Sequence, residues 1–111
     1  MTLIRERITN NIMHVIARPQ LIKFYQREGC KDAKGPIDAW WHEAKKANWQ
    51  SWPEIKAQYG SASILKNNRI VFNLGGNKYR LVVKINFPTK IVLIRFVGTH
   101  KEYDKINAEE I

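Results

Sequence analysis

The sequence predicts an α+β fold in which a small antiparallel sheet is packed on one side by two or three helices. Apolar side chains recur at helical spacing up to residue 60, whereas from Arg69 to Val97 they alternate with polar ones at the period of two that strands have. The turn-forming pair Gly75-Gly76 separates two of these alternating stretches. A length of 111 residues allows one modest core, so we expect a single domain.

The first twelve residues precede the first predicted element. We expect residues 1–12 to be an N-terminal extension of unknown role and residues 13–111 to form the domain. The extension mixes Arg5, Glu6 and Arg7 without a long apolar run, a composition that speaks against a secretory signal.

Helical patterns dominate the first half, after a short apolar run at residues 13–17 that predicts a strand. A helix is expected over residues 19–29, because proline is tolerated in the first helical turn and glycine stops a helix. A second helix is expected over residues 35–48, where apolar side chains recur at helical spacing. A third is expected over residues 51–60, which open with Ser-Trp-Pro-Glu, a match to the capping box.

Three strands are expected next, at residues 69–74, 78–87 and 90–97, which are rich in Val, Ile, Phe and Tyr. Glycines between the first two supply the positive φ angles of a tight hairpin, and Pro88-Thr89 marks the second turn. In the middle strand the odd-numbered side chains are apolar or aromatic, and most even-numbered ones are polar or charged. One sheet face therefore packs against the helices and the other carries charge.

Turn length decides which residues face each other across these strands. With two-residue turns in both hairpins, Asn73 is expected opposite Lys78, and Val82 between Arg69 and Arg95. The face so formed gathers the polar side chains of all three strands: Arg69, Asn73, Lys78, Arg80, Lys84 and Arg95. Because guanidinium groups bind phosphate oxygens bidentately, this face is a candidate phosphate cradle.

An exposed sheet face kept soluble by its charges is the alternative, and for Lys84 and Lys90 it is the interpretation we favour. Arg80 and Arg95 point more strongly to function. Arg95 interrupts an apolar run, where a charge lowers stability unless something uses it.

A short helix is expected from Thr99, with Thr99 as its N-cap and Glu102 three residues later. On it, His100 and Tyr103 are three residues apart and share a side. Phosphodiester cleavage in RNA needs one group to take the ribose 2′-OH proton, another to protonate the leaving oxygen, and a cation on the phosphate. This pair beside arginines could supply that chemistry; a helix cap and a core aromatic are the alternative.

The net charge of +9 favours a polyanionic partner such as RNA, DNA, anionic lipid or an acidic protein, with a plain solvated surface as the alternative. Between Ser61 and Lys101 no acidic residue occurs, so we expect the cations there to face water or an outside anion. They are Lys66, Arg69, Lys78, Arg80, Lys84, Lys90, Arg95 and Lys101.

Several classes of protein are excluded. A single cysteine leaves no disulfide framework and no cysteine-based zinc site, and a reducing cytosol is expected. The three histidines are scattered, so no metal is expected, and no phosphate-binding loop is present. No apolar stretch reaches the roughly 18 residues of a membrane span. Four tryptophans between residues 40 and 52 favour core packing or a partner interface over base stacking.

Three motifs resemble the HigB toxins of bacterial type II toxin–antitoxin systems. They are Ala-Lys-Lys-Ala-Asn-Trp at residues 44–49, Val-Phe-Asn-Leu-Gly-Gly-Asn-Lys-Tyr-Arg-Leu-Val-Val at residues 71–83, and Ile-Arg-Phe-Val-Gly-Thr-His-Lys-Glu-Tyr-Asp at residues 94–104. The similarity covers roughly residues 13–111. It implies a RelE/ParE-like fold and a ribosome-dependent mRNA endonuclease that inhibits translation by metal-independent cleavage.

The resemblance also implies roles for matching residues. Arg80 and Arg95 would contact the phosphate or its transition state, and His100 and Tyr103 would act as acid–base or substrate-orienting groups. Asp104 would orient a neighbour or cap the helix. With the charged face, this gives Arg69, Lys78, Lys84 and Lys101 as candidate RNA contacts; no cofactor is expected.

The implied partners are a HigA-type antitoxin, mRNA on the ribosome, and operator DNA reached through the antitoxin. The expected location is the cytoplasm, without a membrane partner. Two alternatives remain: a ParE-like gyrase poison, and a module that binds RNA or the ribosome without catalysis.

Overall fold

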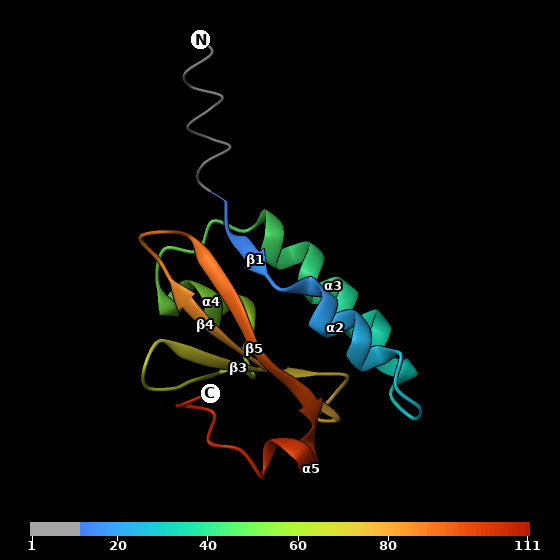
Figure 1. The fold of residues 1–111 in the computed structure, drawn as a ribbon. Helices are drawn as coiled ribbons and strands as arrows, with labels where there is room; N and C mark the ends of the chain where they lie inside the picture. Colours follow the sequence, from blue (N-terminus) through green and yellow to red (C-terminus); the bar gives the residue numbers. More distant parts are fainter. Residues whose placement is uncertain (1–11) are drawn as a thin grey trace.

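The computed structural model describes residues 12–111 as a five-stranded sheet with helices packed against it (Figure 1). The expected extension, residues 1–12, lies outside the described residues except for Ile12. In chain order the elements are β1 (His14–Ile16), α2 (Arg18–Tyr25), the 3₁₀ turn η1 (Lys31–Ala33), α3 (Lys34–Lys46), α4 (Trp52–Gln58), β2 (Ser63–Ile64), β3 (Arg69–Leu74), β4 (Tyr79–Asn86), β5 (Ile91–Thr99) and α5 (His100–Tyr103). The α+β class is therefore confirmed.

The strands lie in the order β1-β5-β4-β3-β2. The hairpins β3–β4 and β4–β5 are antiparallel, as predicted, and β2 extends the sheet antiparallel to β3. Strand β1 was expected as a strand, but it pairs parallel to β5, with Val15 opposite Val92. The sheet is thus mostly, not wholly, antiparallel.

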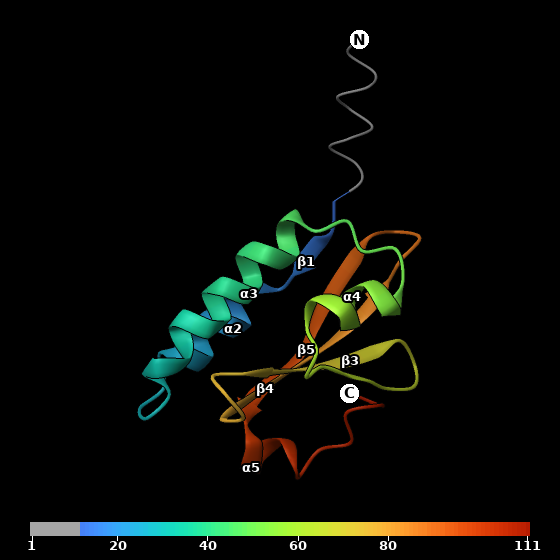
Figure 2. The same cartoon turned by 180° about the vertical axis from the view of Figure 1, so that it is seen from behind.

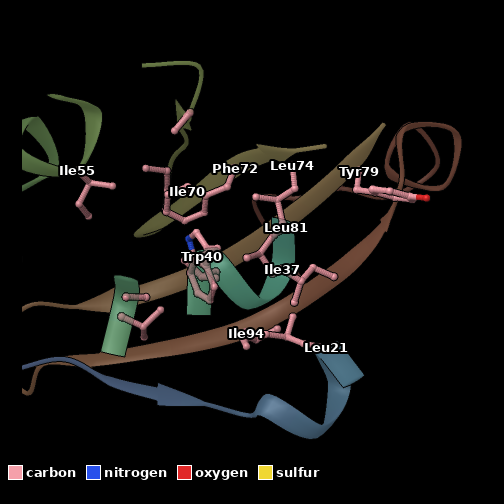
Figure 3. Close-up of a cluster of buried hydrophobic side chains, with 14 of the residues drawn as sticks. Leu21, Ile37, Trp40, Ile55, Ile70, Phe72, Leu74, Tyr79, Leu81 and Ile94 are labelled. Atoms are coloured by element: carbon pink, nitrogen blue, oxygen red, sulfur yellow. The ribbon is translucent and has the colours of Figure 1, made fainter. Parts of the chain in front are cut away.

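The main core lies between the sheet and the three longer helices (Figure 3). Figure 2 shows α3 and α4 in front of the sheet, with α2 beside α3. Side chains at helical spacing meet the odd-numbered face of β4, and the large members of this core are Leu21, Phe24, Ile37, Trp40, Trp49, Ile55, Ile70, Phe72, Leu81 and Ile85. Core packing is therefore confirmed for Trp40 and Trp49, which are 1% and 3% exposed.

The helix ends differ in detail from the prediction. Helix α2 begins at Arg18 and ends at Tyr25, four residues before the predicted stop. Helix α4 begins where the sequence predicts, but Ser51 does not cap it. The Ser51 hydroxyl donates to the Glu54 carboxylate over 3.3 Å, and its oxygen accepts no hydrogen bond from the helix amides. The predicted two-residue turn between β3 and β4 is wrong as well.

That turn comprises residues 75–78, so Asn73 faces Arg80 rather than Lys78. Gly75 and Gly76 do have the positive φ angles expected, 61° and 66°. The register moves by two residues, which changes partners without exchanging the faces of the strands.

Strand β5 carries one residue more than the prediction allows. Ile94 faces Val83, yet Phe96 rather than Arg95 faces Val82, with the irregularity between Val82 and Val83. Arg95 is the extra residue of a β-bulge, which leaves it outside the regular pairing. The expected pairing of Val82 with Arg95 is therefore wrong.

The charged face is not open along its whole length. Val71 and Val82, at its centre, are 3% and 0% exposed, and Ala108 is buried with them. Phe96, Tyr103, Ile106 and Ile111 pack around this second cluster. The C-terminal segment, residues 104–111, turns back after α5 to cover it (Figure 1). Val82 was counted with the polar face, and a small second core forms there instead.

Candidate active site

Arg80 lies near the start of β4, opposite Gly98 of β5, and is only 9% exposed. Its Nη1 donates to the carbonyl oxygens of Asn77 and Tyr79, over 3.0 and 3.4 Å. Its other nitrogens have no hydrogen bond within residues 12–111, yet they are not sealed from solvent. The guanidinium is therefore held by the hairpin backbone while keeping donors for an anion.

Helix α5 starts immediately after β5 through the capping box that the sequence predicts. The Thr99 hydroxyl accepts the Glu102 amide over 3.1 Å, and the Glu102 carboxylate accepts the Thr99 amide over 2.9 Å. These reciprocal bonds fix the direction in which the four-residue helix leaves the strand. They thereby place the side chains of His100 and Tyr103 beside the sheet.

Tyr103 of α5 lies against Arg80. The guanidinium carbon of Arg80 is 6.0 Å from the centroid of the Tyr103 ring, at the outer limit of a cation–π contact. The Phe96 ring is 6.4 Å from the Tyr103 ring, centroid to centroid. Tyr103 is therefore packed between a cation and an aromatic ring.

His100 is held mainly through its backbone, and its imidazole is about half exposed. Its amide donates to the Lys78 carbonyl over 3.1 Å, which ties α5 to the β3–β4 hairpin. Its Nδ1 is 3.2 Å from an Asp104 carboxylate oxygen, an ion pair whenever the imidazole is protonated. Asp104, which was expected to orient a neighbour or to cap the helix, is thus adjacent to His100.

The remaining candidates lie in three places. Lys101 is exposed on α5, and Lys78 lies in the β3–β4 turn, where its carbonyl accepts the His100 amide. Arg69 and Lys84 face each other at the opposite end of the sheet, four residues or about 13 Å along β4 from Arg80. Arg95 is exposed at the bulge.

Arg69 is 8% exposed and hydrogen-bonded within the protein. Its Nη1 donates to the Asn67 carbonyl over 2.8 Å, and its Nε donates to the Ile111 main-chain oxygen over 3.1 Å. Its Nη2 also donates to Ile111. This side chain anchors the segment that covers the second cluster.

The expectation that every cation from Ser61 to Lys101 lacks an acidic partner is wrong for Lys78, which pairs with Asp32. Asp32 also accepts a hydrogen bond from the Tyr79 hydroxyl. The hydrogen bonds from Lys78 and Tyr79 hold the pKa of Asp32 below its ordinary value. The bond to Asp32, with burial adding to it, raises the pKa of Tyr79 to about 12.

Glu102 has a second partner besides Thr99. Arg27, just beyond α2, donates from Nη2 and Nη1 to the two Glu102 carboxylate oxygens, over 2.9 and 3.3 Å. The Arg27 guanidinium, together with the Thr99 amide, holds the pKa of Glu102 below its ordinary value. Sequence reasoning missed Arg27 and Asp32, because no local pattern links residues 75 and 46 positions apart.

Within residues 12–111 no cluster of three His, Cys, Asp or Glu side chains has the geometry to hold a metal ion. In the same part of the chain no helix is long and apolar enough to cross a membrane. What the site offers is a fixed guanidinium, a phenol and an imidazole at one end of the sheet.

Comparisons with known proteins show the family of the chain. Residues 33–106 match the family described as HigB_toxin, RelE-like toxic component of a toxin-antitoxin system. The chain is 41% identical over 56 residues to the mRNA interferase toxin HigB of Escherichia coli (strain K12), a match covering 49% of this chain and 54% of that protein. The mRNA interferase HigB of Shigella flexneri matches to the same extent.

The chain thus spans about half the length of the curated relatives that it matches. The family match is longer and includes the hairpin, the bulge and α5, and so every residue of the candidate site from Arg69 to Tyr103. Because that match covers more than half of the sequence, the chain belongs to the HigB toxin family.

Proposed function

We propose that this chain is the toxin of a type II toxin–antitoxin system, an endoribonuclease that cleaves mRNA on the translating ribosome and so inhibits translation. The observation that carries the proposal is the contact between Arg80 and Tyr103, 6.0 Å apart, with His100 on the same helical turn. A cation beside two proton-transfer groups is the set that RNA cleavage through the 2′-hydroxyl needs.

In the proposed reaction the ribose 2′-oxygen attacks the adjacent phosphorus and the bond to the 5′-oxygen of the next nucleotide breaks. The products are a 2′,3′-cyclic phosphate and a 5′-hydroxyl. One proton leaves the 2′-hydroxyl and one reaches the departing oxygen, and His100 and Tyr103 are the groups proposed to carry them. Arg80 stabilises the extra negative charge on the phosphate oxygens in the transition state.

Arg95 is proposed, with Arg80, to contact the reacting phosphate or its transition state, and Lys84 and Lys101 are proposed to contact phosphates along the message. Arg95, Lys84 and Lys101 are exposed, and none of these three has a side-chain hydrogen bond or ion pair within residues 12–111. Arg69 and Lys78 are proposed contacts as well, although both also have partners within the protein.

We also propose a HigA-type antitoxin as the neutralising partner, operator DNA bound through that antitoxin, and a cytoplasmic location. The family description, a toxic component of a toxin–antitoxin system, supports an antitoxin partner.

The test is induction of the chain in a bacterial host, with mRNA 5′ ends mapped across the transcriptome. We expect new in-frame ends in translated messages, and their loss in the double variant Arg80→Ala/Tyr103→Phe. A matched control, Lys46→Ala/Tyr25→Phe, removes the same kinds of group from α2 and α3 and should cut like the wild type. Growth arrest without new ends would replace the proposal with a gyrase poison, and no arrest would replace it with a binding module.

A further inference from the structure

The connection between α2 and α3 is far from the candidate site in the sequence but contacts it in the structure. Arg27, in this connection, makes a two-pronged contact with Glu102 of α5, over 2.9 and 3.3 Å. Within residues 12–111, this is the only ion pair between α5 and the helical layer. The guanidinium also lies over the Phe24 ring, 5.0 Å from its centroid, and is therefore itself held in place.

The Glu102 carboxylate has two tasks at once. One oxygen accepts the Thr99 amide and so closes the capping box, while both oxygens accept from Arg27. In a helix of only four residues, His100 to Tyr103, no interior turn fixes the orientation. The capping box and the contact to Arg27 therefore help to orient α5, together with the packing of Tyr103 against the second cluster.

Asp32, in the same connection, also binds the β3–β4 hairpin next to Arg80. Asp32 accepts from the Tyr79 hydroxyl and from the Lys78 ammonium, and the Lys78 carbonyl accepts the His100 amide over 3.1 Å. Arg27 and Asp32 thus hold the two sides of the site, α5 and the hairpin, against one segment.

We propose that Arg27 and Glu102 are positioning residues, whose contact orients α5 so that His100 and Tyr103 face Arg80. The proposal rests on the proposed function for what the orientation achieves. Neither residue is proposed to touch the RNA. Displacing a reacting group by about 1 Å can lower a rate about a hundredfold, so a contact of this kind acts through geometry.

The exposure of the Arg27 and Glu102 side chains distinguishes a positioning role from a contribution to the overall stability of the fold. The side chains of Arg27 and Glu102 are 48% and 40% exposed, and ion pairs so exposed add little to global stability. Breaking the contact should therefore lower the rate of cleavage while leaving the unfolding midpoint nearly unchanged.

The test is single-turnover cleavage of a defined message on purified ribosomes. Glu102→Gln breaks the charged contact but keeps an amide oxygen that can accept the Thr99 amide, since glutamine also serves in a capping box. We expect Glu102→Gln and Arg27→Gln each to lower the cleavage rate about two- to fivefold at unchanged ribosome affinity, because an exposed ion pair can change the population of correctly oriented α5 by that much. The double variant should lose no more than either single one, and Arg27→Lys should recover part of the rate.

Lys34→Gln is the matched control, because it breaks another exposed ion pair, Lys34 to Asp38 on α3, over 2.7 Å. It should cleave like the wild type. Additive losses in the double variant, or weaker ribosome affinity with an unchanged rate, would overturn the positioning role. The second of these results would make Arg27 an RNA contact.

Amide hydrogen exchange of the isolated protein separates this inference from the proposed function. In Arg27→Gln the Thr99, Glu102 and Asp104 amides should exchange about two- to fivefold faster, the change that an exposed ion pair can support, whereas Lys34→Gln should leave them unchanged. A wild type that fails to cleave would end the proposed function, and faster exchange would still support the positioning of α5. Unchanged exchange in Arg27→Gln would overturn it.

Discussion

The guanidinium of Arg80 and the phenol ring of Tyr103 face each other across the junction of β4 and α5, 6.0 Å from carbon to centroid. Arg80 is fixed from behind by the Asn77 carbonyl, and Tyr103 by the Phe96 ring. Neither side chain has to reorganise to stay beside the other. The guanidinium and the phenol are therefore already next to each other in the isolated protein.

Arg80→Lys keeps the charge but removes the planar guanidinium, which binds the hairpin carbonyl and, in the proposed reaction, would also bind the phosphate. We expect the cleavage rate to fall about a hundredfold, as when one preorganised donor is lost from an active site. The control is Arg18→Lys, which makes the same change in an arginine 4.3 Å from the Trp41 ring and remote from the site. Equal losses in the two variants would contradict a special role for Arg80.

Gly98→Ala should destabilise the protein, because a methyl group there would come within 2.5 Å of the Phe96 ring and 3.0 Å of the Glu102 carboxylate. Phe96 packs in the second cluster and Glu102 closes the capping box, so neither can move freely. We expect a loss of about 1–3 kcal/mol in the free energy of unfolding, measured with urea. Gly60→Ala, which meets nothing within 4 Å, should change it by less than about 1 kcal/mol.

Tyr79 should lose its proton at a higher pH than an ordinary tyrosine. Its hydrogen bond to Asp32 raises its pKa from 10.0 to about 12 in the folded state. The stabilisation linked to this shift is therefore fully present below pH 10 and is lost as the pH rises through about 12. Subtracting the tyrosinate absorbance of Tyr79→Phe from that of the wild type should isolate this step.

Asp32→Asn should move the same step to lower pH, and Asp38→Asn, a carboxylate paired on α3, should not. A Tyr79 step near pH 10 in the wild type would rule out the hydrogen bond.

Arg69 and Lys84 face each other in the sheet, yet they should respond differently to substitution. Arg69→Met leaves the Asn67 and Ile111 oxygens without their donor, and should lower the free energy of unfolding by about 1–3 kcal/mol. Lys84→Met removes an exposed charge and should change it by less than about 0.5 kcal/mol. Urea unfolding measures both.

RNA binding provides a separate test for Lys84. If Lys84 contacts a phosphate, Lys84→Met should reduce the slope of log affinity against log salt by about 0.7, the value for one contact to single-stranded RNA. An unchanged slope would remove Lys84 from the proposed contacts. For Arg69 the RNA contact stays a prediction, and the structure adds the anchoring of residues 104–111.

Local pattern was enough for much of this fold. Alternation located β3, β4 and β5, and the capping box at Thr99 and Glu102 was recognisable because its two residues are three positions apart. The Gly75-Gly76 pair indicated a turn but not the length of that turn, since glycine fits both two-residue and longer turns. The predicted register of β3 and β4 was wrong by two residues, an even number, so each side chain was still assigned to the correct face of the sheet.

Other features depend on contacts that no local pattern encodes. Arg95 was recognised as a charge that interrupts an apolar run, but no local pattern indicated the β-bulge at that point. Its contact with phosphate stays a prediction. Val82 was an apolar residue on a polar face, which in retrospect signals the second core. The partner of Glu102 is 75 residues away, and such pairs form only once the tertiary fold exists.

Because Arg27 and Glu102 are 75 positions apart in the sequence, they are synthesised at different times. A ribosome adds about 5–20 residues per second, so roughly 4–15 s pass between the synthesis of Arg27 and that of Glu102, 75 positions later. During this interval the helical layer has emerged, but it has no α5 to hold. In each newly made molecule the contact between Arg27 and Glu102 therefore forms only after the helical layer has been synthesised.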